Sequence, residues 1–167
     1  MNFSVSSPAL CRISVLAALF AGIPTAWAQT SVVLNSSPTR VLGHVKVNQQ
    51  TSAPNLVEGR EFYAPQSIAL DTSVTPPILY VADTINNRVL AFKNATSLSK
   101  GNTADKVIGQ RDLISTTPQG PNSGSGGLST GLSVPIAVAV DKSGNLYVID
   151  AGNQRILRYP KPLQQTG

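Results

Sequence analysis

Apolar residues occur in short runs along this chain, and polar, turn-forming residues separate the runs. The runs are rich in β-branched and aromatic residues, which favour strands. They predict strands at 68–70, 78–82 and 89–92, and a further apolar run covers 146–149. Beyond residue 28, no stretch shows the 3.6-residue period of an amphipathic helix. The pattern therefore predicts an all-β protein.

Two copies of one unit account for these runs. The first copy extends from Ala64 to Phe92 and the second from Val134 to Tyr159, and the offset between them changes from 70 to 67 residues because the first copy has a longer turn at 72–77. The copies share Pro65 and Pro135, Tyr80 and Tyr147, Asp83 and Asp150, Asn86 and Asn153, and Arg88 and Arg155. Such repetition indicates that each copy folds as one supersecondary unit.

Each copy supplies three strands, and a fourth is available beside it. Val41–Gly43 and Val107–Gly109 share a pattern at an offset of 66, so either Val41–Gly43 or Lys106–Gly109 can supply the fourth strand of a unit. The residues of Asp141–Asn145 suit a tight turn between antiparallel strands. We therefore expect blades of four antiparallel strands, the unit of a β-propeller.

The shared residues resemble the NHL repeat. The resemblance covers residues 60–92 and 130–160, and it is carried by Pro-x-x-(Ile/Val)-Ala-(Leu/Val)-Asp followed by Tyr-Val-x-Asp-x-x-Asn-x-Arg. It implies propeller blades in rings of about six, in proteins that mostly bind other molecules. A minority of similar propellers are enzymes, either lyases that process amidated peptides or enzymes that act on lactones.

The first 28 residues have the order of a secretory signal peptide. Arg12 precedes an apolar run at 13–23, and Ala26–Ala28 fits a cleavage site. The run is too short to span a bilayer. We expect a secreted or periplasmic protein that is cut after Ala28 and does not contact the membrane afterwards. The only cysteine, Cys11, is lost with the signal, so the mature chain has no disulfide.

Composition and charge narrow the classes of partner. Of the residues, 41% are hydrophobic and only 13% are charged, with a net charge of +5. Aliphatic residues are too plentiful for a disordered chain. Because the basic residues form no cluster, we expect no nucleic-acid partner.

The expected organisation of the chain follows from these features. It consists of a signal peptide at 1–28, one or more strands of a partial blade at 29–59, a first blade at 60–105, a strand with a Gly/Ser/Pro-rich loop at 106–131, and a second blade with the C-terminal residues at 132–167. The loop is interpreted as a tolerated insertion. The alternative is that it carries the binding surface.

The polar residues of the repeat are predicted to be structural. They are Asp71, Asp83, Asn86 and Arg88 in the first copy, and Asp141, Asp150, Asn153 and Arg155 in the second. Asp and Asn satisfy backbone groups of turns, and Arg pairs with a carboxylate. An active site needs one special blade, whereas a role in folding explains why both copies carry the set.

No catalytic, cofactor or metal site is expected. A zinc site needs several His or Cys ligands, whereas His44 is the only histidine. The glycine-rich loop precedes no helix and is not a nucleotide-binding motif.

Two blades do not close a ring, because propellers have 4–8. The chain is therefore a piece of a longer propeller, a subunit of a homo-oligomeric ring, or a marginal structure with a partial third blade. The function expected is that of a binding or interaction module for a protein or carbohydrate ligand. The alternatives are part of a lactonase- or lyase-type enzyme, and a small oligomeric lectin-like ring.

Overall fold

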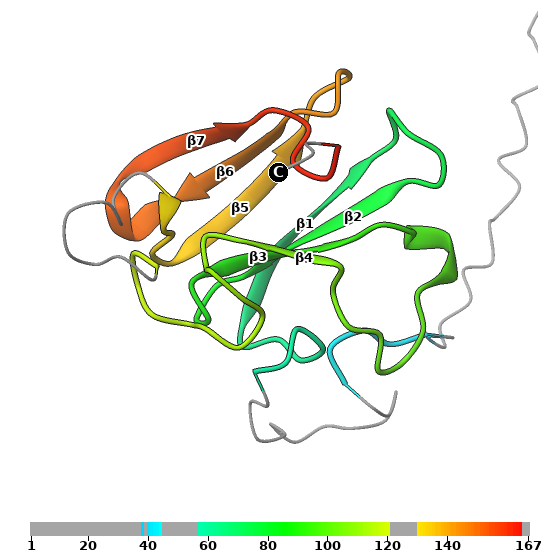
Figure 1. Ribbon diagram of the computed structural model, residues 1–167, viewed down its shortest axis with the longest axis horizontal. Helices are drawn as coiled ribbons and strands as arrows, with labels where there is room; N and C mark the ends of the chain where they lie inside the picture. The colour runs from blue at the N-terminus through cyan, green and yellow to red at the C-terminus, as the bar shows by residue number, and fades with distance from the viewer. Residues whose placement is uncertain (1–37, 39, 45–56, 121–129, 165–167) are drawn as a thin grey trace, which may run out of the picture. The chain divides into compact units, whose positions relative to one another are not determined.

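The computed structural model describes residues 38, 40–44, 57–120 and 130–164, which contain two antiparallel sheets (Figure 1). The first sheet has the order β1-β2-β3-β4 and the second the order β5-β6-β7. The strands are β1 Pro65–Asp71, β2 Ile78–Asp83, β3 Arg88–Phe92, β4 Lys106–Ile108, β5 Pro135–Val140, β6 Leu146–Asp150 and β7 Arg155–Tyr159. The prediction of an all-β chain with blade-like sheets is confirmed.

The two sheets repeat each other in detail. β1 and β5 each begin at a proline, and the register with the next strand shifts directly after it, between Pro65 and Ser67 in the first sheet and between Pro135 and Ala137 in the second. The residues before the two prolines both have a φ of 51°. The 3-10 turns differ, because η1, Ala95–Ser97, follows β3, whereas η2, Ala151–Asn153, lies between β6 and β7.

The main apolar core lies between the sheets. Its buried members are Ile78, Tyr80, Ala82, Val89, Ala91 and Ile108 from the first sheet, with Leu132, Val138, Leu146 and Val148 from the second half of the chain. Removing these side chains from water holds the two sheets together.

A second cluster covers the other face of the first sheet. Leu79, Val81, Leu90, Phe92 and Ala104 are buried there, and Leu42, Phe62, Ala95, Leu98, Val107 and Leu113 pack against them. The Phe62 and Phe92 rings meet edge to face with centroids 6.3 Å apart. Both faces of β2 and β3 are therefore buried, whereas Ile68 and Leu70 of β1 are exposed.

The fourth strand of the first sheet is β4, which pairs with β3 through Val89 opposite Ile108. Val41–Gly43 does not join this sheet. Leu42 packs against the second cluster, and Gly43 forms a single parallel bridge with Glu61. Of the two segments offered by the sequence, Lys106–Gly109 is thus the one that completes the first blade.

The described part of the expected loop, residues 110–120, is bound to the first sheet. The Gln110 side chain donates to the carbonyls of Asn87 and Thr117 at 2.9 and 2.8 Å. Residues 121–129 and the predicted signal peptide lie outside the described residues. Within the described ranges, no helix is long and apolar enough to cross a membrane.

Candidate functional site

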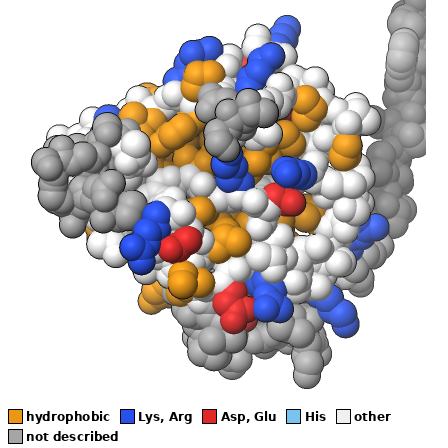
Figure 2. Space-filling model, viewed as in Figure 1, with side chains coloured by type: hydrophobic (Ala, Val, Ile, Leu, Met, Phe, Trp, Pro, Cys, Tyr) orange, Lys and Arg blue, Asp and Glu red, His pale blue; other side chains and the backbone are white. Residues whose placement is uncertain are grey.

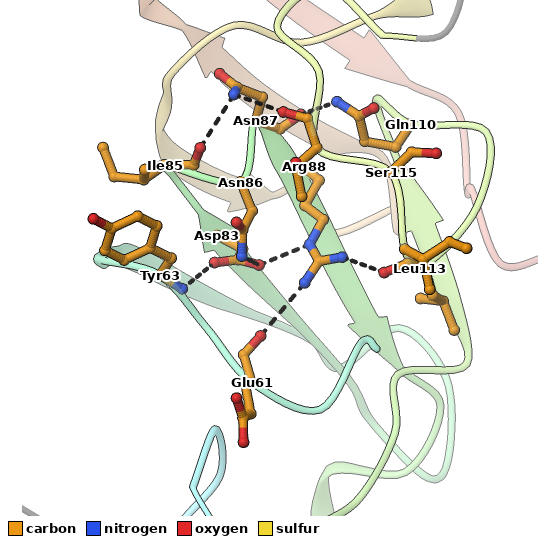
Figure 3. Close-up of polar contacts among 12 residues, drawn as sticks. Glu61, Tyr63, Asp83, Ile85, Asn86, Asn87, Arg88, Gln110, Leu113 and Ser115 are labelled. Carbon is orange, nitrogen blue, oxygen red and sulfur yellow. Dashed lines mark hydrogen bonds and ion pairs between the residues drawn. The ribbon is translucent and has the colours of Figure 1, made fainter. Parts of the chain in front are cut away.

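Asp83 organises the turn between β2 and β3 (Figure 3). Its Oδ1 accepts from the backbone N–H of Tyr63 at 2.6 Å. Its Oδ2 accepts from Asn86 Nδ2 at 2.9 Å and from Arg88 Nε at 2.7 Å. One carboxylate thus ties the segment before β1 to the turn and to the start of β3.

Arg88 is the largest side chain with no exposure to water among the described residues. Besides Asp83, its guanidinium donates to the carbonyl of Leu113 and, at 3.4 Å, to that of Glu61 (Figure 3). A buried charge needs such a complete set of partners. These contacts leave neither ion of the pair open to a ligand.

The second blade repeats this arrangement. Asp150 accepts from the backbone N–H of Ser133 at 2.7 Å, from Asn153 at 2.8 Å and from Arg155 Nε at 2.8 Å. Arg155 also donates to the Gly131 carbonyl at 2.7 Å. Its side chain nevertheless stays 25% exposed, whereas that of Arg88 is fully buried.

The two remaining aspartates of the repeat stabilise turns at the other end of the strands. Asp71 accepts from the N–H and hydroxyl of Ser73 at 2.9 and 2.6 Å. Asp141 accepts from the Asn145 side chain at 2.8 Å and from its N–H at 2.9 Å. These hydrogen bonds, the Asn145 side chain first, lower the pKa of the Asp141 carboxyl.

Burial raises the pKa of two tyrosines near these aspartates. Burial, and then the charge of Asp71, raise the pKa of Tyr80 to about 12. Burial also raises the pKa of Tyr159 to about 12, with Asp150 adding to the effect. Both phenols therefore stay protonated at physiological pH.

Three side chains of the first blade hold the second blade in place, and the sequence did not single them out. Thr84 Oγ1 donates to the Pro135 carbonyl at 2.8 Å, Asn87 Oδ1 accepts from the Val134 N–H at 2.9 Å, and Ser67 Oγ accepts from the Val138 N–H at 3.1 Å. The sequence feature that could have identified them is a difference between the copies, because the second blade has Ala151, Gln154 and Ala137 at the positions of Thr84, Asn87 and Ser67.

The outer face of the second sheet is apolar and exposed, and it is the candidate binding surface. The register places Ala137, Ile149 and Ile156 in one row across the sheet, and Ala139, Tyr147 and the exposed Arg158 in the next. All of these except Arg158 line a hollow, and these five residues are called the open face below. Ile149 is 40% exposed and Ile156 68%.

The open face is suited to apolar contact rather than to chemistry. Its side chains carry no ionisable group other than the Tyr147 phenol, with Arg158 at its edge. The eight polar residues of the repeat lie at strand ends or in the turns. Within the described part of the chain, no three His, Cys, Asp or Glu side chains are grouped so as to hold a metal ion.

Comparison with known proteins agrees with the repeat in the second blade. The family model of the NHL repeat matches residues 132–159, which contain β5, β6 and β7. No curated protein matches the chain.

Proposed function

Because this chain carries an NHL repeat and folds into propeller-type blades, we propose that it is an exported interaction module and that the open face is its binding surface. The observation that carries the proposal is the contrast between the two sheets. Both faces of β2 and β3 in the first sheet are covered, whereas the second sheet exposes Ile149 and Ile156 on its outer face.

The exposed apolar surface favours a macromolecular partner. On the face shown in Figure 2, hydrophobic side chains lie beside Lys and Arg side chains. Apolar patches rimmed by polar groups are typical of protein–protein contacts. A carbohydrate would instead need aromatic and polar groups together, and Tyr147 is the only aromatic residue of the open face.

The proposal assigns no catalysis to these blades. The acids and arginines of the repeat are engaged in internal hydrogen bonds, Asp83 with Arg88 and Asp150 with Arg155. A lyase- or lactonase-type reaction would need a free acid or base, or a metal, at a substrate site.

Export is the second part of the proposal, and it rests on the signal-like order of residues 1–28. Cells that express the full chain should release a product whose first residue is Gln29. N-terminal sequencing of the protein recovered outside the cytoplasm measures this, and an intact Met1 on that protein would contradict it.

Photo-crosslinking tests the binding surface. A photoreactive amino acid at Ile156 should give a discrete adduct in producing cells, and the same amino acid at Ile114 should not. Ile114 is a matched control because it is 69% exposed, against 68% for Ile156, and lies outside the open face. Equal labelling at both positions would contradict the assignment.

A further inference from the structure

The open face corresponds to the face of the first sheet that is buried between the sheets. In the repeat, Ile149 and Ile156 occupy the positions of Ala82 and Val89. Ala82 and Val89 are 0% exposed because the second sheet packs against them. A further sheet of the same build could therefore cover the open face in the same way.

The opposite end of the blade pair carries the complementary surface. Val138 and Val140 of β5 pack into the core between the sheets. Their counterparts in β1 are Ile68 and Leu70, which are 68% and 52% exposed. Each end of the pair therefore exposes apolar side chains at positions that the other blade keeps buried.

The strand edges are complementary as well. Among the described residues, β7 has no partner on the edge that corresponds to the edge of β3 paired with β4. The segment 40–43 is the sequence counterpart of 106–109, and it lies against the first sheet without joining it.

The segment 40–43 is also held in the same way as 106–109. Gly43 and Gly109 have φ values of 89° and 90°. A Cβ at Gly43 would lie 2.4 Å from the Phe62 ring, and a Cβ at Gly109 would lie 2.5 Å from its counterpart Leu132. Residues 40–43 thus have the backbone position of a fourth strand, and no sheet among the described residues includes them.

We propose that the open face binds a second copy of this chain, head to tail. Ile68 and Leu70 of one copy pack on Ile149 and Ile156 of the next, and residues 40–42 pair with the free edge of β7. The inference rests on the proposed function and names its partner. A second copy is favoured because this chain contains both halves of the contact, and because the same contact already joins its two sheets.

Such a contact is heterologous, since the two copies contribute different surfaces. Head-to-tail contacts form a ring when the rotation closes. Because propellers have about 4–8 blades and each copy contributes two, a closed ring contains about two to four copies.

The β3–β4 register predicts the pairing across the new contact. Val89 lies opposite Ile108 in the first sheet, and the counterparts of these two residues are Ile156 and Leu42. Ile156 of one copy therefore lies opposite Leu42 of the next, and Leu42 extends the apolar row of the open face. In the same way, the pair of Ala91 and Lys106 predicts that Arg158 of one copy lies opposite Arg40 of the next. Like charges directly opposite each other weaken a strand pair, so Arg158→Glu should tighten the association.

The face is tested by variants of the purified full chain in sedimentation velocity. Ile68→Asp and Ile156→Asp should each weaken self-association by about a hundredfold or more, because a carboxylate would be buried without a partner. Ile114→Asp is the matched control and should associate like the unchanged chain.

Mixing the two defective variants is the decisive step. Ile68→Asp retains an intact open face and Ile156→Asp an intact β1 face, so the mixture should form a pair of one copy each and no larger species. No complex in the mixture, or a monomeric unchanged chain, would overturn the inference. A specific crosslink from position 156 to another protein would still support the proposed function in that case.

The strand pairing has its own test in the same instrument. Arg158→Glu should lower the dissociation constant, and Lys142→Glu, which makes the same change in net charge on an exposed turn, should not. Unchanged or weaker association of Arg158→Glu relative to Lys142→Glu would overturn the pairing of residues 40–42 with β7.

Discussion

At the scale of single residues, the two copies of the repeat use the same side chains in different surroundings. Arg88 and Arg155 form the same ion pair, yet only Arg88 is fully buried, because the Leu113 carbonyl and the residues around it cover its guanidinium. A paired charge in a dry environment loses more when its partner is removed than one in contact with water. The two ion pairs therefore have the same geometry, but we expect the loss of one partner to cost more stability in the first blade than in the second.

Arg88→Ala should lower the free energy of unfolding by about 3–5 kcal/mol, because Asp83 would remain buried without its cation. Arg155→Ala should cost less, since water reaches that site. Urea denaturation of both variants measures the difference. Equal losses would show that burial does not distinguish the two pairs.

The two buried tyrosines make stability depend on alkaline pH. A folded-state pKa of about 12 for Tyr80 and Tyr159, above the ordinary 10.0, means that the unfolded chain releases these protons first. Stability is therefore complete below pH 10 and is lost as the pH rises from 10 to about 12. Tyr80→Phe should reduce this loss in urea titrations at pH 9 and 11. If Tyr80→Phe loses as much free energy of unfolding between pH 9 and pH 11 as the unchanged chain, the titration of Tyr80 is not the cause of the loss.

At the scale of the elements, the first blade holds the second through hydrogen bonds at strand ends as well as through the apolar core. The Thr84 hydroxyl reaches the first residue of β5. Thr84→Val keeps the shape of the side chain but leaves the Pro135 carbonyl without this donor. It should destabilise the chain by about 1 kcal/mol and speed amide exchange in β5. Faster exchange in β1 alone would contradict this role.

The repeat made the strands predictable, because strand residues are what the two copies share. Pro65, Tyr80 and Asp83 mark the same structural positions as their counterparts 67 or 70 residues later. Shared residues say nothing of how one copy contacts the next. Thr84 and Asn87 act between the blades, so their roles became visible only when the sheets were placed side by side.

The choice of the fourth strand was open for a related physical reason. Val41–Gly43 and Val107–Gly109 have nearly the same sequence, and local pattern does not say which strand edge each segment meets. The choice is made by chain connection, since only 106–108 follows β3 closely enough to pair with it. The exposure of Ile149 and Ile156 was equally hidden, because an apolar residue has the same sequence signal whether covered or not.

At the scale of the whole molecule, the described residues form a pair of blades with one covered contact between them and two uncovered apolar surfaces outside it. Exposed apolar faces and free strand edges favour association. The contact within the chain is the best guide to what covers them, since it shows how these sheets pack. With the proposed contact, the chain is a unit of assembly.

The most direct measurement is amide hydrogen exchange in β7, Arg155–Tyr159, as a function of the concentration of the full chain. The amide groups of β7 that are not bonded to β6 should become protected as the concentration rises, because residues 40–42 of another copy pair with them. Exchange in β2, which lies between β1 and β3, should not change with concentration. Rapid exchange in β7 at every concentration would contradict the account.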